Sequence, residues 1–161
     1  MEENMSSNKL DSVDTRILKV LQTDGRITNS ELAERVRLSP AACHKRLKRL
    51  ESDGTIKFYT VVLDRRFVGC PQSVFIQVQL ERLGHEGIDA FEKAVMKVPE
   101  IIECHLMSGT FDYLLHVVVR DTEEFEKLHR HVLTALPGII RMTSSFGLRN
   151  IKQRGALPIR A

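Results

Sequence analysis

Residues 27–56 read ITNSELAERVRLSPAACHKRLKRLESDGTI and contain two helix starts and one helix stop. Thr28 and Glu31 form the first start, a capping box in which each side chain satisfies the other's free backbone N–H. Ser39 caps the second start, and Pro40 takes its first helical position, where a missing N–H costs nothing. A short helix, a tight turn and a basic helix that ends at a glycine predict a helix-turn-helix DNA-binding unit.

Positive charge is concentrated in the same segment. The chain has 24 lysines and arginines and 21 aspartates and glutamates, which gives a formal net charge of +3. Residues 35–66 hold nine basic and three acidic side chains, whereas residues 67–161 hold eleven of each. The excess therefore lies where a polyanion would be attracted most strongly. A solvated helix face is the alternative, and it is less favoured because the charge coincides with the turn and helix.

The basic helix has two faces. Cys43, Leu47 and Leu50 are spaced at i, i+4 and i+7, so they are expected to face the core. The opposite face has a small residue at its start and cations further on, which allows close approach to base edges and contact with phosphates. For His44, a solvated position is the open alternative to a DNA contact. We predict eight DNA-contacting residues: Ser39, Pro40, Ala41, His44, Lys45, Lys48, Arg49 and Lys57.

The flanking segments complete a first domain over residues 10–71. Residues 10–23 predict a helix with Asp11 as its N-cap. Residues 56–63 are rich in β-branched and aromatic side chains, so they predict a short β-wing. Residues 1–9 are expected to be a flexible N-terminus, and residues 154–161 a tail.

Residues 72–153 follow a different pattern, in the order βαββαβ. An alternating strand from residue 72 precedes an amphipathic helix that ends at Pro99. Two strands follow, on either side of the turn Ser108-Gly109, and then a helix capped by Asp121 and a last alternating strand. This order predicts a ferredoxin-like α+β sandwich in which four antiparallel strands carry both helices on one face.

The second face of that sheet has no helix to cover it. Phe75, Leu115 and Val117 are expected on this face, and their apolar character favours pairing over solvation. We therefore predict a homodimer formed sheet against sheet.

Several classes of function are disfavoured. The longest apolar runs are too short to span a bilayer, and residues 1–4 lack the basic start of a signal peptide. Three scattered cysteines favour a reduced, cytoplasmic setting. None of the six histidines stands in a metal-binding spacing, and no phosphate-cradling glycine loop is present. We expect no enzyme, catalytic residue, metal or cofactor, and no membrane partner.

These motifs, taken in order, resemble the Lrp/AsnC family of transcription regulators over nearly the whole chain. The first domain carries Leu10-Asp-x-x-Asp14, Asp24-Gly-Arg-Ile27, Leu38-Ser-Pro40, Arg46-x-x-Arg-Leu-Glu51 with Gly54-x-Ile56, and Tyr59-Thr60. The second carries the run from Glu103 to Leu115. The resemblance implies an N-terminal winged helix-turn-helix for double-stranded DNA and a C-terminal domain that binds small effectors, usually amino acids. It also implies dimers that assemble into tetramers or octamers.

The resemblance places the effector at the turn between the second and third strands. Gly109 permits close backbone approach or a positive φ, and Asp112 has the chemistry to accept hydrogen bonds from an α-ammonium. The residues alone favour a purely structural role, in which Gly109 makes a tight turn and Asp112 caps it. The resemblance reverses that preference. Thr110 departs from the acidic or amide residue that the family often has, which argues against leucine. An architectural DNA-binding oligomer without an effector is the alternative. The predicted effector-binding residues are Met107, Ser108, Gly109, Thr110, Phe111, Asp112 and Tyr113.

Overall fold

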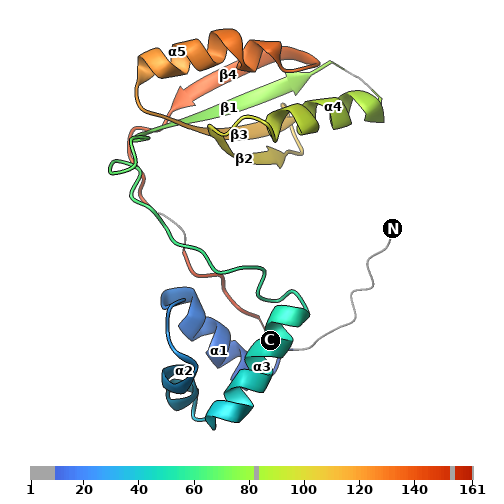
Figure 1. Ribbon diagram of the computed structural model, residues 1–161. Coiled ribbons are helices and arrows are strands. Elements are labelled where there is room, and N and C mark those ends of the chain that lie inside the picture. Colours follow the sequence, from blue (N-terminus) through green and yellow to red (C-terminus); the bar gives the residue numbers. More distant parts are fainter. Residues whose placement is uncertain (1–9, 82–83, 153–154, 161) are drawn as a thin grey trace. The chain divides into compact units, whose positions relative to one another are not determined.

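The computed structural model describes residues 10–81, 84–152 and 155–160, and the chain forms two compact units (Figure 1). Unit 1 contains the residues up to Val62 and those from Lys152 onward, and unit 2 contains Leu63–Ile151. Residues 63–71, expected to belong to the first domain, fall in unit 2. The predicted flexible N-terminus, residues 1–9, lies outside the described residues. Of the predicted tail, residues 155–160 are described, and they belong to unit 1.

In the part of unit 1 that the structure describes there are three helices, whose caps were predicted from the sequence. The helices are α1 (Ser12–Thr23), α2 (Asn29–Val36) and α3 (Pro40–Ser52). Asp11 caps α1, and its carboxylate accepts from the backbone N–H of Val13 and of Asp14. The capping box of Thr28 and Glu31 is confirmed at α2. Ser39 caps α3 by accepting from the Ala42 N–H, with Pro40 as its first residue.

The core of unit 1 lies where the three helices meet. The predicted inward positions of α3 are confirmed, since Cys43 and Leu50 are fully buried and Leu47 packs against them half-buried. Burial of such side chains contributes about 1.5–3 kcal/mol each. The buried residues of this core are Ile17, Leu32, Ala33, Val36, Cys43 and Leu50.

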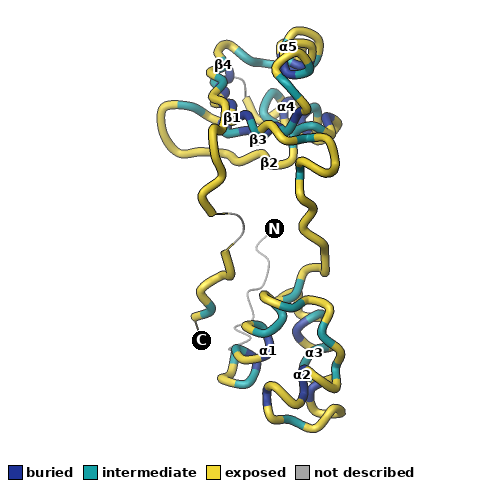
Figure 2. Tube along the Cα trace, turned by 90° about the vertical axis from the view of Figure 1, so that its left-hand side faces the viewer, coloured by how far each residue is buried: buried dark blue, intermediate teal, exposed yellow. Residues whose placement is uncertain are grey.

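The predicted β-wing is wrong as a strand. Residues 57–63 have no regular secondary structure, and Phe58 and Val61 are exposed, as Figure 2 shows for this segment. Side chains of this kind favour strands only when a neighbouring strand provides hydrogen bonds and a packing surface. This segment has no such neighbour among the described residues, so its composition does not produce a strand.

Unit 2 has the predicted element order βαββαβ. Its sheet consists of β1 (Gln72–Leu80), β2 (Ile101–Leu106), β3 (Tyr113–Val119) and β4 (Ile139–Phe146), arranged β2-β3-β1-β4 with every pair antiparallel. The helices are α4 (His85–Val95) and α5 (Thr122–His131), followed by the 3-10 turn η1 (Leu133–Ala135). The α+β fold class predicted from the sequence is thereby confirmed.

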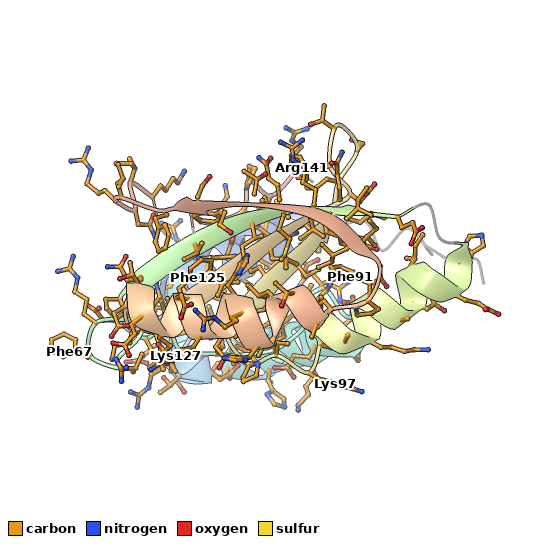
Figure 3. The ribbon with its side chains drawn as sticks, turned by 90° about the horizontal axis from the view of Figure 1, so that it is seen from above. Phe67, Phe91, Lys97, Phe125, Lys127 and Arg141 are labelled. Atoms are coloured by element: carbon orange, nitrogen blue, oxygen red, sulfur yellow. The ribbon has the colours of Figure 1, made fainter. Side chains whose placement is uncertain are left out.

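Both helices cover one face of this sheet. Phe91 of α4 and Phe125 of α5 point toward the strands, whereas Lys97 and Lys127 lie on the far side (Figure 3). The strands contribute alternate residues, with Val74, Ile76 and Val78 of β1 fully buried. The apolar side chains of both helices are buried in this one core.

Two residues expected on the open face of the sheet lie in the core instead. Leu115 and Val117 are fully buried, and they pair with the core residues Ile76 and Val74 of β1. Strand β3 has apolar residues on both of its faces, so its own sequence does not determine which face is buried. Its register with β1 places Leu114, His116 and Val118 on the open face instead. That face is more polar than predicted, with Phe75 stacked on the His116 ring at 4.5 Å between centroids.

The C-terminal segment is bound to α1. The Gln22 side-chain amide donates to the Leu157 carbonyl at 3.3 Å, and the Leu157 N–H donates to Gln22 Oε1 at 2.5 Å. One side chain therefore satisfies both backbone groups of Leu157, in the way a neighbouring strand would.

Candidate nucleic-acid interface and effector loop

The turn between α2 and α3 sets where the basic helix begins. Arg37 ends α2 in the left-handed conformation, with φ of 60°. Among the non-glycine residues that the structure describes, it alone has a positive φ. The Leu38 N–H then donates to the Ala33 carbonyl at 2.9 Å, which closes the helix end. Asn29 Nδ2 donates to the Pro40 carbonyl at 3.0 Å and ties the start of α2 to the start of α3. The first turn of α3 is thus held by backbone geometry and one side chain.

The predicted DNA-contacting residues share one exposed surface along α3, except for Lys57, which follows it. Ala41, His44 and Lys45 are exposed, and Lys45 forms no ion pair with any part of the chain that the structure describes. Lys48 Nζ lies 3.7 Å from Glu51 Oε2, and its side chain is 68% exposed. Exposed pairs of this kind contribute little to stability, so Lys48 can exchange Glu51 for a phosphate. These positions suit contact with a polyanion.

Arg49 is placed differently from the other predicted contacts. Its Nη2 lies 2.6 Å from Oδ2 of Asp14, a carboxylate that is fully buried. Arg46 Nη1 lies 2.8 Å from Oδ1 of the same carboxylate and 2.6 Å from Asp11 Oδ2. The Asp14 backbone N–H and the Arg46 guanidinium lower the pKa of Asp11 to about 2. The role of Arg49 as a DNA contact stays a prediction.

Sequence reasoning did not identify Asp14 or Arg46 as members of a site. A signal was present, because α1 carries acids three residues apart and α3 carries arginines three residues apart. Side chains at i and i+3 lie on the same side of a helix, so the two pairs match in spacing. What the sequence did not provide was the packing of α1 against α3, which brings them together.

The predicted effector loop is anchored to β1. The Asp112 N–H donates to the Val78 carbonyl at 2.9 Å, and Asp112 Oδ2 accepts from the Leu80 N–H at 2.8 Å. Gln79 Nε2 donates to the Thr110 carbonyl at 2.8 Å. Gly109 has φ of 153°, a conformation that side-chain-bearing residues rarely adopt. The loop is therefore tied to β1 at Thr110 and Asp112, while Met107 and residues 108–110 remain exposed.

Tyr113, the last predicted effector residue, belongs to the core. Its ring is 2% exposed and packs on Phe91 at 4.8 Å, and its hydroxyl donates to Glu92 Oε1 at 2.7 Å. Burial and then the Glu92 carboxylate raise the pKa of Tyr113. Tyr113 therefore supports the loop from beneath, and a direct part in effector binding stays a prediction.

No cluster of three or more His, Cys, Asp or Glu side chains in the described ranges is arranged to hold a metal ion. No helix within those ranges is long and apolar enough to cross a membrane.

Comparison with known proteins matches both units of the chain. Residues 10–57 match the winged helix-turn-helix DNA-binding family, and residues 73–157 match the Lrp/AsnC ligand binding domain. Leucine-responsive regulatory protein of Escherichia coli (strain K12) is 41% identical over 151 residues, which covers 94% of this chain and 92% of that protein.

Solved structures give the same result. A transcriptional regulator from Neisseria meningitidis, crystallised as an L-Met complex, superposes with a TM-score of 0.88 at 38% identity, covering 92% of this chain and 96% of that one. An AsnC family regulator from Agrobacterium tumefaciens also has a TM-score of 0.88, at 32% identity, with 92% and 97% covered.

Proposed function

The chain belongs to the Lrp/AsnC family of transcription regulators, and on that premise we propose that α3 reads DNA while the loop of residues 107–113 binds an amino acid that alters DNA binding or assembly. The proposal that α3 reads DNA rests on the exposed cationic face of this helix, where the excess positive charge of the chain is concentrated. The L-Met complex of the Neisseria meningitidis regulator supports the second half. A regulator of this kind acts in the cytoplasm, with the DNA.

The proposed interface places the start of α3 in the major groove. Small residues there permit close approach, and the lysines behind them contact bases or phosphates. Lys57, beyond the helix, contacts the backbone of the DNA. The proposed interface residues are Ser39, Pro40, Ala41, His44, Lys45, Lys48, Arg49 and Lys57.

The DNA half is tested by replacing Lys45 and Lys48 with alanine in the full chain. The probe is a duplex selected by the unaltered protein from a randomised library, with binding followed by fluorescence anisotropy at several salt concentrations. Affinity should fall, and the slope of log K against log salt should decrease by about 0.9 per lost phosphate contact. The double variant Lys93→Ala and Lys97→Ala removes the same charge from unit 2 and should bind normally. Equal behaviour of the two variants would place the interface elsewhere.

The effector half rests on the chemistry of an anchored, exposed loop. Asp112 uses one carboxylate oxygen for Leu80, which leaves Oδ1 for an α-ammonium group. Backbone N–H groups near Gly109 suit the α-carboxylate. Because residues 108–110 are exposed in a single chain, a bound amino acid needs further walls, and a neighbouring copy of the chain would provide them.

A thermal-shift screen of the twenty amino acids tests this half. An effector at a hundred times its Kd should stabilise the folded state by about 2.7 kcal/mol. It should also change affinity for the selected duplex. Stabilisation by none of the twenty, together with unchanged DNA affinity, would favour the architectural alternative.

Assembly is the remaining part of the proposal. The open face of the sheet, with Phe75 stacked on His116, is proposed as the surface of a homodimer, and tetramers or octamers follow by further association. Light scattering should give a dimer or larger at micromolar concentration. Phe75→Glu would put a charge at this face and should shift the mass downward, whereas Lys127→Ala on α5 should not. A monomeric unaltered protein would refute the proposal.

A further inference from the structure

We propose that Asp14 is a positioning residue for DNA reading, which fixes the orientation of α3 on α1 by binding Arg46 and Arg49. Arg49, which the sequence predicts as a DNA contact, takes part in this positioning through its Nη2. The inference rests on the proposed DNA-reading role of α3. It assigns a function to a network within unit 1, whereas the effector loop belongs to unit 2, and the network is not needed to explain the charge of the helix.

Burial makes the network obligatory. Asp14 is fully buried, and among the described residues it is the single polar or charged residue in the buried class. A carboxylate removed from water is costly unless it is paired and its lone pairs are satisfied. Oδ1 accepts from Arg46 at 2.8 Å, and Oδ2 contacts Arg49 at 2.6 Å and accepts from the Asp11 N–H at 3.2 Å. Both oxygens are therefore committed to groups whose positions they determine.

Direction distinguishes this contact from the rest of the α1–α3 packing. The apolar contacts of Cys43 and Leu50 turn one face of α3 toward the core, but they are non-directional and set its rotation about its own axis only coarsely. Charged hydrogen bonds from arginine have a preferred geometry. Arg46 and Arg49 are one turn apart, so two such bonds to one carboxylate define the rotation of the helix. The rotation in turn sets where Lys45 and Lys48 point.

The network also links α3 to the cap of α1. Asp11 Oδ1 accepts from the Val13 and Asp14 N–H groups at 2.8 Å each, while Oδ2 binds Arg46. The carboxylates that start α1 therefore also hold the DNA-reading helix. Of the four cations at positions 45, 46, 48 and 49, Arg46 and Arg49 bind the start of α1. Lys45 and Lys48 stay on the exposed face, where Lys48 has only the long contact of 3.7 Å with Glu51.

The test compares Asp14→Asn with Asp24→Asn in the full chain. Both variants raise the net charge of unit 1 by one, but Asp24 pairs at 3.7 Å with exposed Arg35 and does not contact α3. Each protein is titrated with the library-selected duplex and with a scrambled duplex of the same length. Asp14→Asn should lose about fivefold or more of its preference for the selected duplex, comparable to one lost base contact. Its affinity for the scrambled duplex should be unchanged or higher, because released arginines add to the basic surface. Asp24→Asn should keep the preference.

Further variants separate the possible failures. A merely structural role for Asp14 would lower both affinities equally, and Asp14→Glu, which restores the charge, should recover part of the preference. If Asp14→Asn does not fold, Asp11→Asn decides, because asparagine also caps a helix well but loses the charged bond to Arg46. An unchanged preference in these variants would overturn the inference. If the Lys45 and Lys48 double variant binds normally, the interface itself is wrong, which is a separate result.

Discussion

The backbone N–H of Leu80 and the carboxylate of Asp112 are joined by a hydrogen bond of 2.8 Å that closes the end of β1 onto the loop before β3. The acid proposed to bind an effector is therefore also a structural residue. Its two oxygens have different tasks, and a variant at this position affects both.

Asp112→Ala should lower the free energy of unfolding by about 0.5–1.5 kcal/mol, because the Leu80 N–H loses its partner in a part-buried hydrogen bond. Asp112→Asn keeps an acceptor oxygen and should cost less. Urea unfolding of both variants measures the difference. An equal cost for the two would mean that the hydrogen bond to Leu80 contributes nothing. Asn, and not Ala, is consequently the informative substitution for effector binding.

Tyr113→Phe should lower the free energy of unfolding by about 1 kcal/mol through loss of the hydrogen bond to Glu92. Tyr59→Phe is the matched control, because the Tyr59 hydroxyl binds Glu51 at 3.1 Å on an exposed surface, and its cost should stay within about 0.5 kcal/mol. The folded-state pKa of Tyr113 is raised above the ordinary tyrosine value of about 10, so its contribution is present below pH 10 and declines at higher pH. Chemical unfolding at pH 7 and pH 11 tests both statements.

Arg37→Gly should raise the free energy of unfolding by about 0.5–1 kcal/mol. A left-handed residue with a side chain bears roughly 1–2 kcal/mol of strain, which exceeds the entropy cost of a glycine. Arg35→Gly, two residues earlier within α2, should instead cost up to about 1 kcal/mol. Thermal unfolding of the pair is the measurement, and the same sign for both variants would contradict the explanation.

Stability should fall in acid partly through Asp11. Its pKa is about 2 in the folded state, below the ordinary aspartate value of 3.8, so its contribution is present above about pH 4 and is lost as the pH falls toward 2. The difference in stability between the unaltered protein and Asp11→Asn should therefore shrink between pH 5 and pH 2. Urea titrations across this range give the difference, and a constant gap would show that the pKa of Asp11 is not lowered.

Helix boundaries were predictable because their determinants are local. Thr28 and Glu31 lie three residues apart, and Ser39 and Pro40 are adjacent, so each cap is complete within one turn. The element order of unit 2 was predictable for the same reason. None of these features depends on contacts between distant parts of the chain.

Features that depend on pairing between elements were not predictable. The buried face of β3 follows from its register with β1, and residues 57–63 form no strand because no partner strand is supplied. Arg49 looked like a free cation in the sequence because Asp14, its partner, lies 35 residues earlier on another helix. The DNA-contacting and effector residues were predicted from local sequence patterns and from the family resemblance, and their roles stay predictions.

The bond between Gln22 and Leu157 has a consequence for biosynthesis. Its partners are separated by 135 positions in the chain, and a ribosome adds about 5–20 residues per second. Helix α1 therefore emerges roughly 7–27 seconds before the segment that binds it. In that interval all of unit 2 is synthesised as one continuous stretch. Unit 1 therefore begins to emerge before unit 2, and its C-terminal segment is added only after unit 2 has been synthesised.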